Sequence, residues 1–118
     1  MLANIGSVRI TSDAHVKWSY IMAFITVSHW TSDEVMSDET ITEAQDRFVP
    51  MILKAGAKAV HMVRTGEKTS MVITHYSDSS TAEAAQAEIA EVRSQASSDF
   101  PMQMASAHAG EVTASGGG

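Results

Sequence analysis

Apolar residues recur at strand-like or helix-like spacing in six successive stretches of this chain. The first, from Tyr20 to Trp30, is rich in aromatic and β-branched residues and predicts a strand that is apolar, and therefore covered, on both faces. Three further strand-like stretches follow at 59–64, 69–76 and 102–112, and two helix-like stretches separate them, starting at Thr40 and Ser80. The predicted order is strand, helix, strand, strand, helix, strand.

This order predicts an α+β fold of the ferredoxin-like type, a split βαβ sandwich with a four-stranded antiparallel sheet. Right-handed crossovers place the strands in the spatial order 4-1-3-2, with both helices on one face. We expect one domain over residues 20–113, an N-terminal appendage at 1–19, where apolar alternation is weak, and a flexible tail at 114–118.

The first helix has recognisable start and stop signals. Thr40 and Glu43 have the spacing of a capping box, and Gly56 supplies the left-handed position that ends the helix at about Ala55. Pro50 predicts a kink in the turn before it. Apolar residues at helical spacing predict one buried side, formed by Ile41, Ala44, Phe48, Met51, Ile52 and Ala55.

The second helix begins at another capping box, Ser80 with Glu83. The narrow apolar side of this helix is formed by Ala82, Ala85, Ile89, Val92 and Ala96. Arg93 then falls among the residues that are expected to face solvent.

Residues 65–68 connect two strands tightly enough to predict a hairpin. With a turn of two or four residues, Arg64 pairs with Thr69, and this register places His61 and His75 on opposite faces of the sheet. A turn of three or five residues reverses the arrangement, because a slip of one residue moves every side chain to the other face.

Composition excludes several classes of partner. Fourteen acidic and 8 basic residues give a formal charge of −6, so we expect neither nucleic acid nor an acidic membrane surface as a partner. The chain has no cysteine, no apolar stretch near the roughly 18 residues of a membrane span, and no signal-peptide pattern, so a cytoplasmic location is expected.

The predicted sheet also indicates a partner. Its face without helices carries many apolar residues, and soluble monomers seldom expose a continuous apolar surface. A second copy of the chain, seated on this face, would bury about 800 Å² on each partner in an ordinary interface. We therefore expect a homodimer formed through the sheet face.

Several short runs resemble the dimeric α/β-barrel superfamily, and within it the small domains of the antibiotic biosynthesis monooxygenase type. The runs are Ala55-Gly56-Ala57, Val60 to Gly66, Val72 to Asp78 and Thr81 to Ala85, and the resemblance covers about residues 22–112. It implies a homodimer in which two sheets face one another, with a small-molecule cavity between each sheet and its own helices. Members include cofactor-independent oxygenases of aromatic or quinol substrates, haem-degrading enzymes, isomerases and decarboxylases, so the fold alone does not imply one function.

Histidine is the most abundant candidate for chemistry, with one residue in each predicted strand: His29, His61, His75 and His108. No two of them have the spacing of a ligand cluster, and no phosphate loop, dinucleotide motif or acidic cluster occurs, so we expect no metal and no cofactor. The plainer interpretation is that these are ordinary strand or interface histidines.

The candidate catalytic residues are His61, His75 and Tyr76, because imidazole can act as a base near neutral pH and a phenol can donate a hydrogen bond. The candidate substrate-binding residues are Trp30, Phe48, Arg64 and His108. An indole can stack on a planar ligand, and a guanidinium can hold a carboxylate or enolate oxygen. Core packing, or a strand end in solvent, explains the same residues without a ligand.

Two function hypotheses follow. In the first, the protein is a cofactor-independent monooxygenase in which a base deprotonates a small aromatic or quinone-like substrate, and the resulting carbanion reacts with oxygen directly. In the second, the protein is a non-catalytic small-molecule-binding or regulatory module. Haem degradation is disfavoured, because the haem-degrading relatives use a helical histidine and neither predicted helix contains one.

Overall fold

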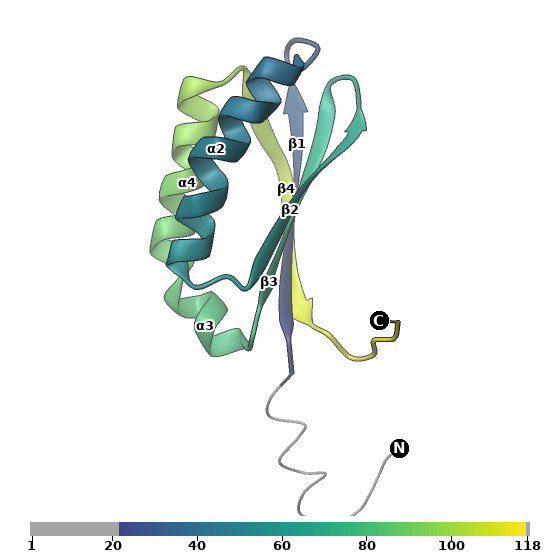
Figure 1. Ribbon diagram of the computed structural model, residues 1–118, viewed down its shortest axis with the longest axis vertical. Helices are drawn as coiled ribbons and strands as arrows, with labels where there is room; N and C mark the ends of the chain where they lie inside the picture. The colour runs from purple at the N-terminus through teal and green to yellow at the C-terminus, as the bar shows by residue number, and fades with distance from the viewer. Residues whose placement is uncertain (1–21, 118) are drawn as a thin grey trace, which may run out of the picture.

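The computed structural model describes residues 22–117, which form a four-stranded sheet with helices on one side (Figure 1). The elements are β1 (Phe24–Ser32), α2 (Asp38–Ala55), β2 (Ala59–Gly66), β3 (Thr69–Tyr76), α3 (Ser79–Ala84), α4 (Gln86–Asp99) and β4 (Met102–Glu111). The sheet order is β2-β3-β1-β4, and every neighbouring pair is antiparallel. The predicted ferredoxin-like fold and strand order are therefore confirmed.

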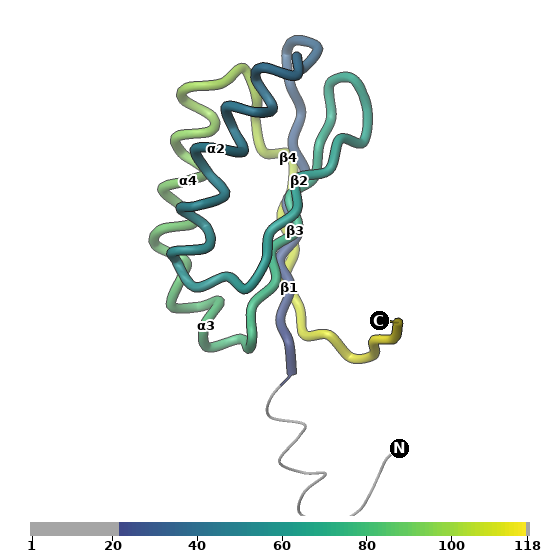
Figure 2. Tube along the Cα trace, in the orientation of Figure 1, coloured from purple at the N-terminus to yellow at the C-terminus, as the bar shows by residue number. Residues whose placement is uncertain are grey.

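The core lies between the sheet and the long helices. α2 and α4 run side by side along one face of the sheet, and α3 follows the end of β3, as the trace in Figure 2 shows. The central residues of each predicted apolar helix side are buried in the core, as predicted. The fully buried members are Ala44, Phe48, Ile52, Ala82, Ala85, Ile89, Val92 and Ala96, which pack with Trp30, Ala57, Tyr76 and Phe100.

The other face of the sheet has no helix over it among the described residues, and we call it the open face. The residues that strand register assigns to it include Ile25, Val27, His29, Thr31, Ala59, His61, Val63, Thr69, Met71, Ile73, His75, Gln103, Ser106, His108 and Gly110. In the single chain Ile25 and Val27 are half-buried and His29 is exposed on this face, so the cover predicted for both faces of β1 requires a second chain here and stays a prediction.

The start of β1 differs from the prediction as well. The strand begins at Phe24 and ends at Ser32, because Thr31 and Ser32 still pair with β4 whereas Met22 and Ala23 have no partner in the register. Of the other predicted boundaries, β4 ends one residue early, at Glu111. The predicted N-terminal appendage lies outside the described residues.

The first capping prediction is wrong by one turn. Ser37 is the N-cap of α2, and its Oγ accepts a hydrogen bond from the backbone N–H of Thr40 at 3.2 Å. Because the helix starts three residues earlier than predicted, the N–H groups exposed at its first turn are those before Glu43, and Ser37 satisfies the one of Thr40. The predicted end is confirmed, since Gly56 has a φ of +128° and caps the helix, which continues through Pro50.

The second capping prediction is also wrong, and the second helix is two helices. Asp78 is the N-cap of α3, accepting hydrogen bonds from the Thr81 N–H at 2.8 Å and the Thr81 hydroxyl at 2.7 Å. A short acidic side chain is a strong N-cap, because it also lies at the positive end of the helix dipole. The helix is interrupted at Ala85, and the chain continues as α4.

The β2–β3 hairpin has the second of the two arrangements that the sequence left open. Arg64 pairs with Ser70 and Gly66 with Thr69, so Thr65 is an extra residue in β2. This bulge, in which the Thr65 hydroxyl donates to Thr69 Oγ1 at 2.8 Å, leaves a two-residue turn and shifts the pairing by one. His61 and His75 therefore share the open face instead of lying on opposite faces.

No helix in the described range 22–117 is long and apolar enough to span a membrane.

Candidate functional site

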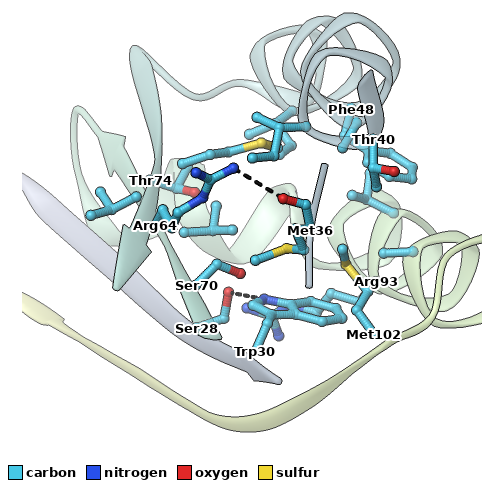
Figure 3. Close-up of a pocket in the computed structure, with 18 of the residues that line it drawn as sticks. Ser28, Trp30, Met36, Thr40, Phe48, Arg64, Ser70, Thr74, Arg93 and Met102 are labelled. Atoms are coloured by element: carbon cyan, nitrogen blue, oxygen red, sulfur yellow. Dashed lines mark hydrogen bonds between the residues drawn. The ribbon is translucent and has the colours of Figure 1, made fainter. Parts of the chain in front are cut away.

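A cavity of about 330 Å³ lies between the helix-facing side of the sheet and α2 and α4. Figure 3 shows side chains from β1, β2, β3, β4, both long helices and the segment before α2 converging on it. This volume is at the lower end of the range of small-molecule sites, about 300–1,000 Å³. The fold therefore offers room for a small ligand at the position that the resemblance implied.

Apolar side chains form most of the cavity wall. Trp30 from β1 and Phe48 from α2 are only 6% and 2% exposed, and both line the cavity. The other apolar side chains of the wall belong to Met36, Ile41, Ala44, Ile52, Met62, Val72, Ile89, Val92, Ala96 and Met102, and Val63 borders the cavity from a position that register assigns to the open face. An indole, a phenyl ring and three thioethers make a wall that suits a flat, apolar molecule.

A group of hydroxyls lies on the sheet side of the cavity. It comprises Thr26, Ser28, Ser70 and Thr74. These residues alternate along β1 and β3 on the helix-facing side, where Ser28 and Thr74 are buried. The Ser28 Oγ accepts a 2.8 Å hydrogen bond from the indole Nε1 of Trp30, which fixes the ring in the wall (Figure 3). Hydroxyls at these positions can orient a ligand that has polar edges.

Two arginines supply positive charge. Arg64 donates a hydrogen bond to the Met36 carbonyl at 3.2 Å and lies 3.6 Å from an oxygen of Asp38. Its side chain is 46% exposed and that of Asp38 fully exposed, so this ion pair contributes little to stability and leaves the guanidinium near the solvent edge.

Arg93 is the second cationic residue of the cavity. It is half-buried on α4 and makes no ion pair with any residue that the structure describes. The prediction that Arg93 faces solvent is wrong, because the narrow apolar side of α4 leaves this position beside the cavity.

Tyr76 is buried beneath the helices, 1% exposed, at the end of β3. Its hydroxyl has no hydrogen-bond partner among the described residues. Burial raises the pKa of the phenol, and the charge of Arg93 partly opposes this. Tyr76 does not line the cavity, but Arg93, which does, is close enough for its charge to lower the pKa of the Tyr76 phenol.

The structure separates the predicted site residues into two groups. Trp30, Phe48 and Arg64 line the cavity, and Tyr76 lies on the same side of the sheet. The histidines His61, His75 and His108 lie on the open face, with His29. None of the four described histidines lines the cavity.

Sequence reasoning missed the hydroxyl group and Arg93. Ser28 precedes Trp30 by two residues in a strand, a spacing that places both on one face, so the sequence held this signal. For Arg93 no such signal existed, because its helix is too poor in large apolar residues to define a sharp boundary between the buried and exposed sides. Among the described residues, no group of three or more His, Cys, Asp or Glu side chains is arranged to hold a metal ion.

Solved structures share this fold. The chain is similar to NE2512, a protein of unknown function from Nitrosomonas europaea, with a TM-score of 0.56, 14% identity and coverage of 80% of this chain and 94% of that one. It is similar to SnoaB, a cofactor-independent oxygenase from Streptomyces nogalater, with a TM-score of 0.53, 12% identity and coverage of 81% and 96%. A dimeric ferredoxin-like protein from an uncultured marine organism gives 0.54, 12% identity and coverage of 85% and 96%.

No protein-family model and no curated protein matches the sequence. At these identities, the similar structures establish the fold alone. They confirm the fold that the resemblance implied, and a cofactor-independent oxygenase and a dimeric ferredoxin-like protein are among the proteins that share it.

Proposed function

We propose that the protein is a homodimer that binds a small aromatic or quinone-like compound in the cavity between the sheet and the helices, and acts on it as a cofactor-independent monooxygenase. The observation that carries the proposal is the cavity itself, with Trp30 and Phe48 in its wall and the guanidinium of Arg93 beside them. A planar apolar ring with an ionisable oxygen complements this combination.

The chemistry of the proposal requires a stabilised anion. Oxygen can react directly with the carbanion form of an activated substrate, so that a CH₂ group becomes a carbonyl and the second oxygen atom leaves in water. The substrate then supplies all of the electrons. Arg93, with no ion pair among the described residues, and Arg64, at the solvent edge, stabilise the enolate or phenolate oxygen, which lowers the cost of deprotonation.

The sequence predicts His61 or His75 as the base, and both lie on the other face of the sheet. We therefore assign substrate stabilisation to the arginines, and Tyr76, which lies outside the cavity lining with a hydroxyl that lacks a described partner, is not given a direct contact with the substrate. The proton then leaves to solvent through the side of the cavity at Arg64, which is half exposed.

A second candidate function is a binding module without turnover. It is favoured because, among the described residues, no imidazole lines the cavity and the one lining carboxylate, Asp38, is fully exposed and paired with Arg64. Such a site can bind an anion through its arginines, but it has no base of its own to remove a proton from the ligand.

The homodimer forms through the open face in this proposal. Its support is the run of apolar residues on that face and the dimeric protein among the similar structures. Two sheets packed face to face would cover Ile25, Val27 and Ile73, which are only half-buried in the single chain.

A ligand screen followed by oxygen uptake tests the function. Purified protein is screened by thermal shift against quinones, hydroxylated aromatics and small lactones, and each ligand is then assayed in an oxygen electrode. A ligand at 100 times its Kd stabilises the fold by about 2.7 kcal/mol, a shift of several degrees in a domain of this size. Oxygen consumption supports the monooxygenase, and binding without consumption supports the second candidate.

Two matched variants locate the site. Arg93→Gln should weaken binding of an anionic hit by about 10- to 100-fold, the value of a hydrogen bond to a charged group. Lys54→Gln removes the same charge from an exposed position at the end of α2 and should leave affinity unchanged. Equal affinity in both variants would contradict the assignment of Arg93.

A further inference from the structure

All histidines of the described chain gather on one surface. His29 and His108 lie on neighbouring strands with ring centroids 6.3 Å apart, and His61 and His75 form a second pair at 5.5 Å. Three of these imidazoles are exposed and His75 is half-buried. The bulge at Thr65 is what brings the second pair together, since it shifts β2 by one residue relative to β3.

Among the described residues, the four strands bring no other titratable group to the open face. None of the residues that register assigns to it is acidic, lysine or arginine. The neighbours of the imidazoles are apolar, with Val27 beside His108 and Ile73 beside His61 in the register. A protonated imidazole here has no carboxylate on the face to neutralise it.

We propose that the open face is a pH-controlled self-association surface, whose occupant is a second copy of this chain and whose four histidines release it when they gain protons. The inference rests on the homodimer of the proposed function and adds its regulation. Two such faces bring eight imidazoles and no counter-charge into one interface.

The direction of the effect follows from desolvation. Imidazole changes charge between about pH 5 and 8. Neutral rings can be buried against apolar side chains, whereas charged rings, without a partner carboxylate, resist burial and repel one another. The dimer binds fewer protons than two monomers, so it is favoured at higher pH and lost as the pH falls through this range.

Net charge acts in the opposite direction. The chain carries a formal charge of −6 at pH 7 and has an isoelectric point near 5.2, so repulsion between two copies weakens as the pH falls toward that value. If only the overall charge mattered, association would become tighter at lower pH. The sign of the pH dependence therefore separates the histidine mechanism from general electrostatics.

Analytical ultracentrifugation at pH 7.5 and pH 5.5, in 150 mM salt with EDTA, tests the inference. EDTA prevents metal ions from bridging the histidine pairs. If each protomer must lose one proton over about one pH unit of this range before it can dimerise, the dimer Kd increases about tenfold per protomer at pH 5.5 and about 100-fold in total. Circular dichroism at both pH values confirms that the chain remains folded.

The variant with His29, His61, His75 and His108 all changed to Gln should dimerise at both pH values, with a Kd at pH 5.5 equal to or lower than its Kd at pH 7.5. If it does not fold, the double variants His61→Gln/His75→Gln and His29→Gln/His108→Gln should each lose part of the pH dependence. His15→Gln, which removes the one histidine outside the described residues, is the matched control and should keep the full 100-fold change.

The outcomes are distinct. A dimer with the same or a lower Kd at pH 5.5 would overturn the pH control and leave the homodimer standing. A quadruple variant with the wild-type pH dependence would also overturn it. A monomer at pH 7.5 would contradict the homodimer of the proposed function, and this inference with it.

Discussion

The indole Nε1 of Trp30 donates a 2.8 Å hydrogen bond to the Oγ of Ser28, two residues earlier on the same face of β1. Both residues are buried, so water cannot replace either partner. This bond joins an apolar wall of the cavity to its group of hydroxyls, and it makes Ser28 a determinant of both stability and ring position.

Ser28→Ala should lower the free energy of unfolding by about 1–3 kcal/mol, because the indole N–H is left buried without an acceptor. Urea denaturation followed by circular dichroism measures the change. Ser70→Ala is the control, since this hydroxyl also lines the cavity but is half-buried and serves no indole. Equal losses in the free energy of unfolding for the two variants would show that the hydrogen bond to Trp30 does not contribute to stability.

Gly56→Ala should destabilise the protein by about 1–3 kcal/mol. The residue has a φ of +128°, which L side chains rarely adopt, and an added Cβ would lie 3.2 Å from Thr81 Cγ2. Gly116→Ala is the control, because its added Cβ meets nothing within 4 Å and its φ is not positive. Thermal or urea unfolding that shows no difference between the two variants would contradict this explanation of the α2 end.

Alkaline pH should destabilise the fold through Tyr76. Burial raises the pKa of its phenol in the folded state above the unfolded value of about 10, so the contribution to stability is full below that value and is lost as the pH rises further. Tyr76→Phe should be at least as stable at pH 7, since the lost hydroxyl has no described partner, and should lose less stability by pH 11.

Urea denaturation at pH 7, 10 and 11 measures the Tyr76 effect. Tyr20→Phe removes the other tyrosine of the chain and leaves Tyr76 in place, so it should keep the alkaline loss. A Tyr76→Phe curve parallel to the wild type across this range would mean that the phenol does not titrate differently in the folded state.

Acid should weaken the start of α3. Hydrogen bonds from the hydroxyl and N–H of Thr81 lower the pKa of Asp78, so its stabilising effect is present above the usual aspartate range and is lost as the pH falls through the folded value. Asp78→Asn keeps an N-cap side chain without a titrating group. The stability difference between wild type and this variant should shrink between pH 6 and pH 3, and a constant difference would contradict the assignment.

Element types, strand order and most of the core could be read from periodicity, because residues such as Phe48, Ile52 and Ile89 recur at spacings that only one face of a helix explains. Register was not predictable. One extra residue, Thr65, changes the face of every β2 side chain, and nothing in the composition of the turn specifies a bulge. The caps moved for a similar reason, since several Ser, Thr and Asp residues compete at each helix start.

A site residue was predictable only where its position followed from the periodicity of its own strand or helix. Trp30 in a strand and Phe48 in a helix line the cavity as predicted. The position of His61 depended instead on the register between two strands. Arg93 required knowledge of how α4 packs beside the cavity, which a mainly alanine helix face does not encode sharply.

A ¹H–¹⁵N NMR titration tests whether the cavity between the sheet and the helices is the ligand site. It follows the indole N–H of Trp30 while the best ligand from the thermal-shift screen is added. The signal is assigned by its loss in Trp30→Phe. If the ligand occupies the cavity between the sheet and the helices, this signal shifts with the same Kd as the thermal stabilisation, since the indole is part of the wall. A ligand that binds with that Kd and leaves the Trp30 signal unmoved would show that it binds elsewhere, and would contradict the assignment of this cavity as the functional site.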